Sequence, residues 1–377
     1  SPFHVPDEIL ALWRAAGARG RAERDAWSAR LGGSPKGARF AAAAAGAVDP
    51  SFDAEIAAHK RGLVDDPKKI ATRKASQLAL DVVNGAVPQT IGGSADLTGS
   101  NNTQTKDLTD FTPQNRSGRY IRYGVREHGM AAAMNGIALH GGLIPYGGTF
   151  LVFTDYCRPS IRLSALMGVR AIYVMTHDSI GLGEDGPTHQ PVEHLASLRA
   201  IPGLCVYRPA DAVETAECWQ LAINDAARPS VISLTRQGVE PARLTHTDDN
   251  LCARGAYILA DAPDPQVVLI ATGSEIGLAL AAQNTLACEA IRARVVSAPS
   301  FELFAEQPAD YREAVLGAAP RVGVEAAVRQ GWDQFLRPDD DFIGMAAFGA
   351  SGPGAKVYEH FGITASAVAD AARALAK

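Results

Sequence analysis

The stretch AIYVMT at residues 171–176, followed by HDSIGLGEDGPTHQP at residues 177–191, decides the fold. Ala171–Thr176 is an apolar, uncharged run of strand length, which is typical of a parallel strand buried on both faces. The polar stretch after it ends at Pro191, a favoured first residue for a helix, which we expect at Val192–Leu198. This pattern predicts a loop at the carboxyl end of a parallel strand, where open α/β sheets bind their ligands.

Segments of the same kind lie on either side of this stretch. The expected strands are Ile91–Asp96, Tyr120–Tyr123, Leu204–Tyr207 and Ser230–Leu234, and the expected helices are Ala75–Val83, Glu127–Leu139 and Val213–Ala226. A second series follows Arg254, with strands at Val267–Thr272, Arg294–Ser297, Arg321–Glu325 and Phe342–Ala346 and helices at Ile276–Leu286 and Ala365–Ala376. Strands that alternate with helices predict parallel sheets covered by helices on both faces.

The fold class predicted for the chain is therefore α/β, with two domains that each contain a parallel or mixed sheet with helices on both faces. The polar stretch Gly238–Asn250 separates the two series and predicts a domain boundary. Residues 1–60 lack a strand pattern and are rich in Ala and Arg, with a helix expected at Asp7–Ala16. We interpret residues 1–60 as a connecting arm, 61–240 as the first domain and 250–377 as the second.

The composition narrows the class of protein. Of 377 residues, 47% are hydrophobic and 20% are charged, as in a globular protein, and the net charge of −5 gives no reason to expect nucleic acid or an anionic membrane as a partner. No apolar run reaches the length of a membrane span. The five cysteines are scattered without a C-x-x-C pair, which argues against a disulfide framework or structural zinc and favours a reducing, cytoplasmic setting.

The loop at 177–191 carries the strongest signal for chemistry. It places two histidines and three acids between His177 and His189, and its three glycines let the backbone turn tightly near a ligand. A surface loop can also collect these residue types. A metal site of His177, Asp185 and His189 is a weaker alternative, because no helical H-x-x-x-H spacing occurs there.

Several further motifs accompany this loop in order along the chain. They are RKAS at 73–76, GGSADL at 92–97 with Ser100-Asn101, YGVRE at 123–127, GTFLVF at 148–153, RPAD at 208–211, SLTRQ at 233–237 and ATGSE at 271–275. Together with the loop, they resemble the transketolase family from about residue 1 to the C-terminus. The resemblance implies a pyrimidine-binding domain followed by a transketolase C-terminal domain.

The resemblance assigns the cofactor contacts. Glu127 would hydrogen-bond N1′ of the aminopyrimidine of thiamine diphosphate and so favour the imino tautomer that deprotonates the thiazolium carbon. By its residue type alone, Glu127 is an acid favoured by the dipole of a helix N-terminus. Phe150, Phe153 and Tyr156 are spaced nearly on one helix face, which by itself indicates a core stripe; the resemblance makes them an aromatic pocket with Phe153 stacked on the pyrimidine.

The resemblance also assigns the substrate contacts. Arg73, Ser100 and Arg236 would hold the phosphate of a sugar, because guanidinium groups meet phosphate oxygens in a bidentate geometry. Asp185 would bind a substrate hydroxyl. His177 and His189 would line the donor carbonyl and the cofactor and transfer protons.

One part of the family pattern is missing. Transketolases hold the cofactor's diphosphate through Mg²⁺ or Ca²⁺ in an N-terminal domain with a Gly-Asp-Gly motif, and no Gly-Asp-Gly occurs here. The resemblance therefore assigns no metal ligand to this chain and implies a partner domain, either in the same longer chain or in a separate subunit. Without it we expect little or no activity, because the diphosphate and its metal are the main electrostatic anchor. A homodimer is also implied.

The implied reaction is transfer of a two-carbon ketol unit from xylulose 5-phosphate to ribose 5-phosphate or erythrose 4-phosphate, in the pentose phosphate pathway. Dihydroxyacetone synthase, deoxyxylulose-phosphate synthase and the β subunit of a 2-oxoacid dehydrogenase are alternatives with the same cofactor. The intact segment from Gly183 to Pro191, together with His177, favours transketolase over the latter two. A non-catalytic scaffold is the alternative from another class, and the retained Glu127, His177, Asp185 and His189 count against it.

Overall fold

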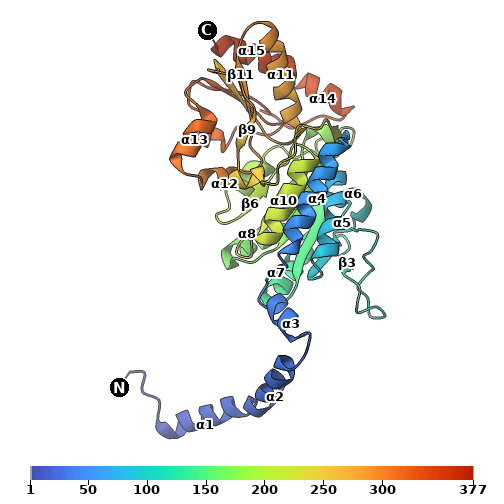
Figure 1. Ribbon diagram of the computed structural model, residues 1–377, viewed down its shortest axis with the longest axis vertical. Helices are drawn as coiled ribbons and strands as arrows, with labels where there is room; N and C mark the ends of the chain where they lie inside the picture. The colour runs from blue at the N-terminus through green and yellow to red at the C-terminus, as the bar shows by residue number, and fades with distance from the viewer. Residues whose placement is uncertain (1, 377) are drawn as a thin grey trace. The chain divides into compact units, whose positions relative to one another are not determined.

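A six-stranded parallel sheet lies at the centre of the first α/β part of the chain (Figure 1). The computed structural model describes residues 2–376. The strands are β2 (Thr90–Ser94), β3 (Tyr120–Arg122), β4 (Ile144–Phe150), β5 (Ile172–Thr176), β6 (Cys205–Tyr207) and β7 (Ser230–Leu234). Their order is β3-β2-β4-β5-β7-β6, with every pair parallel, so their carboxyl ends meet at one edge of the sheet.

Two layers of helices bury this sheet on both faces. In β5, Ile172 and Val174 join the core on one face, while Tyr173 and Met175 join the core on the other. The first face is covered by α4 (Ser51–Asp65), α5 (Thr72–Ala86) and α10 (Ala212–Asn224), and the second by α7 (Glu127–His140), α8 (Thr154–Met167) and α9 (His194–Arg199). The uncharged run in the sequence is explained, because neither face of β5 meets water.

The second sheet is mixed. Its strands are β9 (Tyr257–Ala260), β10 (Val267–Ala271), β11 (Ala293–Ser297), β12 (Arg321–Val324) and β13 (Asp341–Ile343), in the order β13-β12-β10-β11-β9 with only β9 antiparallel among the described pairs. Its helices are α11 (Ile276–Cys288), α12 (Phe301–Ala305), α13 (Ala309–Leu316), α14 (Gly354–His360) and α15 (Ala365–Leu375). Helices α11 and α15 pack on one face, and an aromatic cluster of Phe301, Phe304, Trp332 and Phe335 fills the other.

The remaining elements are short. They are β1 (Ile70–Ala71) paired antiparallel with β8 (Gly238–Val239), α6 (Thr98–Asn101), and the 3-10 turns η1 (Leu151–Phe153), η2 (Ile180–Leu182), η3 (Leu251–Arg254), η4 (Gly273–Glu275) and η5 (Trp332–Gln334). Three of them, α6, η1 and η2, follow the carboxyl ends of β2, β4 and β5. They therefore build the edge at which the sequence predicts the ligand site.

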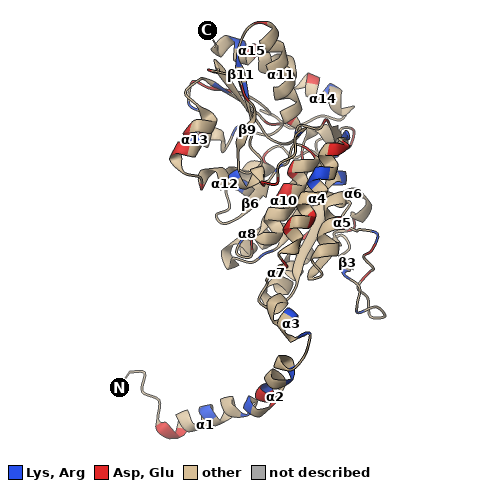
Figure 2. Ribbon diagram, in the orientation of Figure 1, with Lys and Arg blue, Asp and Glu red and all other residues tan. Residues whose placement is uncertain are grey.

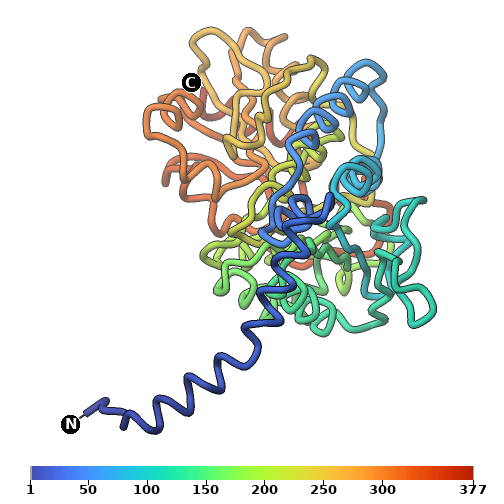
Figure 3. The backbone as a smooth tube through the Cα atoms, turned by 60° about the horizontal axis from the view of Figure 1, so that its bottom comes forward, coloured from blue at the N-terminus to red at the C-terminus, as the bar shows by residue number. Residues whose placement is uncertain are grey.

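The N-terminal residues form a separate unit that ends at Ala47. Within it, α1 (Asp7–Ala18), α2 (Arg21–Gly32) and α3 (Gly37–Ala44) are consecutive helices, and the Trp27 and Phe40 rings meet edge to face with their centroids 6.3 Å apart. Helix α4, inside the arm expected at 1–60, instead belongs to the second unit and lies along α10 (Figure 3). Its Phe52 and Ile56, four residues apart, are buried in the core, which explains this difference from the expectation.

Strand β4 in the middle of the sheet has no counterpart among the predicted strands. Its sequence, IPYGGTF, contains a proline and two glycines, which are rare in strands and hide the pattern. The glycines are needed for packing, because a Cβ at Gly147 would lie 2.5 Å from Met134 Sδ, and one at Gly148 would lie 2.7 Å from Thr103 Cγ2. Helix α10 also differs from expectation: it is buried on nearly all sides rather than amphipathic.

Replacement of Gly148 by alanine is expected to destabilise the chain by about 1–3 kcal/mol, because the added methyl group also comes within 3.1 Å of Asn101 Cβ. Urea unfolding followed by tryptophan fluorescence measures the change. The matched control is Gly85→Ala in α5, where nothing lies within 4 Å of the new Cβ. That variant is expected to gain up to about 1 kcal/mol from helix propensity. Equal stability of the two variants would refute the packing argument.

Charged side chains of both signs are mixed over the helices (Figure 2). Within residues 2–376, no helix combines the length and the low polarity needed to cross a bilayer.

Candidate active site

The candidate residues lie at the carboxyl edge of the six-stranded sheet. His177 directly follows β5, Ser100 lies in α6 after β2, and Phe150 ends β4. Arg236 comes two residues after β7, and Arg73 is the second residue of α5, whose backbone N–H donates to the Thr235 carbonyl. The parallel topology therefore brings together residues that are more than 160 positions apart in the sequence.

His177 occupies the position where the chain leaves β5. Its φ is +60°, a left-handed conformation that is uncommon for a residue other than glycine, and its side chain is 3% exposed. The Nδ1 atom lies 2.8 Å from Thr176 Oγ1, which accepts a 2.8 Å hydrogen bond from Asn101 Nδ2. Ser94 donates to Asn101 Oδ1 at 2.9 Å. This buried chain of hydrogen bonds fixes the orientation of the imidazole.

Two guanidinium groups act on the same imidazole. Burial lowers the pKa of His177 to about 3, with further contributions from the positive charges of Arg73 and Arg236 and from His189. Burial and the charge of Arg236 also lower the pKa of Arg73. These mutual effects require that Arg73, Arg236, His177 and His189 share one small region.

The two arginines have no acidic partner in the described part of the chain. Arg73 donates from Nη1 to the Ser100 carbonyl at 2.7 Å, and Arg236 donates from Nη1 to the Leu182 carbonyl at 3.3 Å. Among the ion pairs of residues 2–376, none involves either arginine. Two neighbouring guanidinium groups that are bound only to neutral carbonyls form a site suited to an anion such as phosphate.

An aromatic wall borders this cationic region. The Phe150 ring lies 3.7 Å from the His177 ring and stacks on Phe153 at 5.6 Å, measured between centroids. His189 meets Phe153 edge to face at 5.6 Å. The expectation that Phe150, Phe153 and Tyr156 share one helix face is wrong, because Phe150 ends a strand, Phe153 lies in η1, and only Tyr156 lies in a helix, where it is 64% exposed.

Glu127 reaches this wall through α8. It is the first residue of α7, is half-buried, and its carboxylate contributes after burial to raising the pKa of Cys157 to about 12. The Cys157 thiol donates to the Phe153 carbonyl at 3.7 Å. Glu127, Cys157 and Phe153 are therefore neighbours. A half-buried acid beside a half-buried phenyl ring fits a planar heterocycle that stacks on the ring and offers a nitrogen to the acid.

Asp185 is the candidate that the structure leaves most open. It is exposed in the loop between Gly183 and Gly186, whose φ values of +90° and +77° form the turn. In residues 2–376, no three His, Cys, Asp or Glu side chains are grouped closely enough to hold a metal ion. The alternative metal set of His177, Asp185 and His189 is therefore not assembled, because Asp185 points to solvent while His177 is buried.

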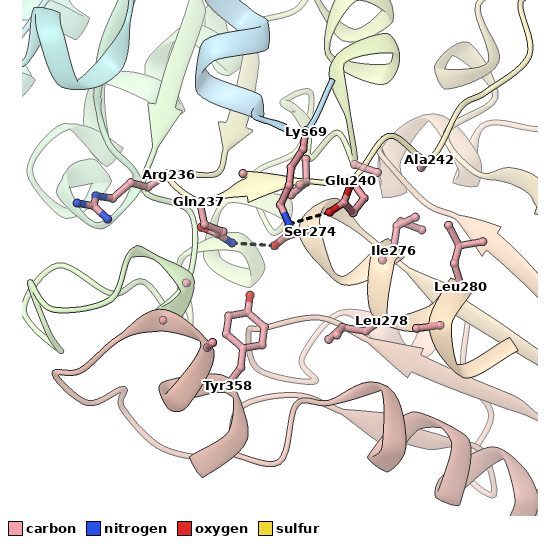
Figure 4. Close-up of a pocket in the computed structure, with 18 of the residues that line it drawn as sticks. Lys69, Arg236, Gln237, Glu240, Ala242, Ser274, Ile276, Leu278, Leu280 and Tyr358 are labelled. Carbon is pink, nitrogen blue, oxygen red and sulfur yellow. Dashed lines mark hydrogen bonds and ion pairs between the residues drawn. The ribbon is translucent and has the colours of Figure 1, made fainter. Parts of the chain in front are cut away.

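Sequence reasoning missed a buried ionic cluster behind the site. Arg208, which is 0% exposed, donates from Nε to Asp178 Oδ2 at 3.0 Å and from Nη1 to Glu275. The signal was available, since Asp178, Arg208 and Glu275 each come just after an apolar strand, where a buried charge needs a partner. In front of this cluster lies a cavity of about 720 Å³, lined by Leu182, Gln237, Ser274, Ile276, Leu280 and Tyr358 among others (Figure 4).

The imidazole of His177 is expected to remain neutral at pH 5, because its pKa of about 3 in the folded state lies well below the ordinary value of about 6.5. Its contribution to stability is therefore complete above pH 6.5 and is lost as the pH falls toward 3. Histidine ¹⁵N NMR, with His177→Asn used to assign the signal, measures the titration. Arg236→Gln is expected to raise this pKa, and an unchanged value would show that the charge of Arg236 does not reach the imidazole.

Comparison with known proteins agrees with this geometry. The transketolase pyrimidine-binding domain family matches residues 68–241, and the transketolase-like C-terminal domain family matches residues 255–364. A transketolase of Cereibacter sphaeroides is 61% identical over 372 residues, which is 99% of this chain and 56% of that protein. The chain thus spans little more than half the length of this curated relative.

Solved structures give the same result. The transketolase of Pichia stipitis in complex with sedoheptulose 7-phosphate superposes with a TM-score of 0.92 at 37% identity, over all of this chain and 56% of that one. A split-gene transketolase, described as an inactive β4 tetramer, has a TM-score of 0.66 at 25% identity and matches 81% of this chain and 98% of its own.

The fold and the site define a two-domain α/β protein of the kind that binds a pyrimidine ring at the carboxyl edge of its first sheet. The chain belongs to the transketolase family, of which it carries the pyrimidine-binding and C-terminal domains.

Proposed function

We propose that this chain supplies the aminopyrimidine and sugar-phosphate half of a transketolase active site, which transfers a two-carbon ketol unit from a ketose phosphate to an aldose phosphate. The donor would be xylulose 5-phosphate and the acceptors ribose 5-phosphate or erythrose 4-phosphate. The observation that carries the proposal is the pair Arg73 and Arg236, which lack acidic partners within residues 2–376 and lie beside His177. A phosphate would neutralise both guanidinium groups.

The substrate contacts follow from this placement. Arg73 and Arg236 would bind the phosphate together with the Ser100 hydroxyl. His177, held neutral by its low pKa, can donate or accept a hydrogen bond at the imidazole nitrogen that Thr176 does not engage. Asp185, exposed in its glycine-rich turn, is free to meet a substrate hydroxyl.

The cofactor contacts would lie on the aromatic side. Thiamine diphosphate supplies a thiazolium carbon that becomes a nucleophile at the donor carbonyl. Phe150, Phe153 and Tyr156 would form the pocket for its aminopyrimidine, with Phe153 stacked on the ring. Glu127 would hold a proton at the ring nitrogen, and His189, at the edge of Phe153, would pass a proton to or from the substrate.

We further propose that the diphosphate and its Mg²⁺ or Ca²⁺ are held by an N-terminal domain, in the same longer chain or a separate subunit. The split-gene transketolase supports this, because a chain of similar extent is described as inactive. In the N-terminal unit, Ile9, Leu12 and Trp13 form an exposed apolar stripe along α1 that offers such a domain a surface. Alone, the chain would then be inactive or weakly active.

A homodimer is part of the same proposal. Large apolar side chains are exposed on and beside α7 and α8, namely Val125, Leu139, Leu143, Tyr156, Leu163, Leu166 and Met167. A surface of this kind on a single chain favours burial against a second copy. Glu127 and Tyr156 lie on these helices, so the dimer contact would adjoin the cofactor pocket.

We also propose the domain division of an arm at 1–60, a pyrimidine-binding domain at 61–240 and a C-terminal domain at 250–377, in a cytoplasmic protein. The family matches at 68–241 and 255–364 support the two domains. The five cysteines are free thiols, four of them buried, which supports a reducing compartment.

The test combines the chain with a separately produced transketolase N-terminal domain, thiamine diphosphate and Mg²⁺, and assays ketol transfer from xylulose 5-phosphate to ribose 5-phosphate. Arg236→Gln is expected to raise the KM for the sugar phosphate by roughly 10- to 100-fold, the value of one charged hydrogen bond of about 1.5–3 kcal/mol. The matched control is Arg329→Gln, an arginine paired with Asp333 on the surface, which should change nothing. No transfer by the mixture, when an intact transketolase is active, would favour a scaffold role.

A further inference from the structure

We propose that Glu275 and Tyr358 of the second α/β domain are positioning residues for His177, acting through a closed ring of buried side chains that holds the two residues after it. The ring, here called the Arg208 clamp, consists of Asp178, Ser179, Arg208, Glu275 and Tyr358. The proposal rests on the proposed function for its catalytic consequence, whereas the clamp itself can be tested on the chain alone.

The clamp closes through four contacts. Arg208 donates to Asp178 Oδ2 from Nε at 3.0 Å and to Glu275 Oε2 from Nη1. The Tyr358 hydroxyl donates to Glu275 Oε1 at 2.6 Å and lies 3.3 Å from Ser179 Oγ. Asp178 and Ser179 are adjacent in the chain, so the ring begins and ends on the segment that carries His177.

The clamp joins two domains. Asp178, Ser179 and Arg208 follow strands of the first sheet, whereas Glu275 lies in η4 after β10 and Tyr358 lies in α14 (Figure 4). The approach is close: Gly273 has a φ of +52°, and a Cβ there would lie 2.8 Å from the Arg208 guanidinium carbon. Gly273 N–H also donates to the Arg208 carbonyl at 3.1 Å. The second domain is therefore built around Arg208.

The conformation of His177 gives the clamp its task. A non-glycine residue at φ +60° is strained and persists only where its surroundings leave no alternative. Before it, the hydrogen bonds of Thr176 and Asn101 hold the imidazole; after it, the clamp holds Asp178 and Ser179. Removing a clamp contact would let the backbone relax toward ordinary φ values and move the imidazole away from Phe150 and the two arginines.

The burial of the clamp makes it rigid. Asp178 is 2% exposed, and Arg208 and Glu275 are 0% exposed, so water cannot replace a lost contact. In such surroundings each charge needs its partner and its hydrogen bonds in place. Glu275 accepts two more hydrogen bonds, from the Ala326 N–H at 3.1 Å and from Ser274 Oγ at 2.7 Å, which fix it to the second domain.

Tyr358→Phe is the test variant, because it removes one hydroxyl and leaves the ring in place. In the chain alone, histidine ¹⁵N NMR is expected to show the His177 signal shifted and its pKa raised from about 3 toward the ordinary value. In the mixture with the N-terminal domain, the KM for xylulose 5-phosphate is expected to rise about tenfold, with the thiamine diphosphate affinity changed less than about twofold.

Tyr311→Phe is the matched control. Its hydroxyl donates to the Ala256 carbonyl at 3.0 Å within the second domain and does not touch the His177 segment. A general loss of packing would lower the melting temperature of both variants alike and leave the His177 signal in place. Ser179→Ala removes the other end of the Tyr358 contact, so the double variant should show no larger shift than either single one.

An unchanged His177 signal and an unchanged KM in Tyr358→Phe would overturn the clamp proposal, whatever the variant's stability. The two proposals fail separately. If the wild-type mixture transfers no ketol unit but the His177 signal shifts in Tyr358→Phe, then the clamp stands and the proposed function falls. If transfer occurs and neither the signal nor the KM responds, then the function stands and the clamp falls.

Discussion

Replacement of Glu127 by glutamine is expected to lower the kcat of the enzyme reconstituted with its N-terminal domain by about 10²- to 10⁴-fold, the usual contribution of a general acid–base group. Glutamine keeps the size and the hydrogen-bonding reach of the side chain but cannot exchange a proton at physiological pH. Steady-state kinetics with saturating xylulose 5-phosphate and thiamine diphosphate measure the effect. The loss should appear in kcat, because the Phe153 platform and the arginines stay in place.

Stability separates this role from a structural one. Glu127 begins α7, so the loss of its charge weakens its interaction with the helix dipole by only about 0.3–1 kcal/mol. Asp310→Asn is the matched control, because Asp310 lies in the first turn of α13, in the other domain. Both variants should unfold at nearly the same urea concentration as the wild type. Full activity of Glu127→Gln would exclude Glu127 as the proton carrier.

The sequence predicted the sheets best where strands are buried on both faces. Ile172–Thr176, Ser230–Leu234 and Val267–Ala271 lie within a residue of the predicted bounds, because uncharged runs of strand length leave little alternative. Strand β4 was missed because Pro145, Gly147 and Gly148 are there for close packing, which a propensity argument counts against a strand. Tertiary contacts, rather than local preference, decide that segment.

The site divides in the same way. The family motifs pointed to His177, Arg73 and Arg236, and the structure brings them together, but no pattern in the sequence shows that the arginines lack acidic partners. The helical spacing assigned to Phe150, Phe153 and Tyr156 failed because the chain passes from strand to 3-10 turn to helix within seven residues. The interdomain clamp could not be predicted, since it pairs residues 178 and 208 with 275 and 358 across two separate sheets.

Replacement of Arg208 by methionine is expected to destabilise the chain by about 3–5 kcal/mol, because it leaves buried carboxylates without their counter-ion. Arg208 is 0% exposed and lies between Asp178 and Glu275, so neither carboxylate can turn to water. Urea unfolding at pH 8 measures the loss. Arg294→Met, which breaks a pair with the largely exposed Asp261, is the matched control and should cost less than about 1 kcal/mol.

The pH dependence of this loss identifies its cause. Burial already raises the pKa of Asp178 in the wild-type protein, and loss of the Arg208 charge, which lowers it, would raise it further. The folded variant would then bind protons more readily than the unfolded chain, so its stability should rise as the pH falls from about 8 to about 5. The deficit relative to wild type should shrink over that range. A deficit independent of pH would show that Arg208 acts through packing alone, whereas recovery of stability by adding Asp178→Asn and Glu275→Gln would show that the uncompensated carboxylates were its source.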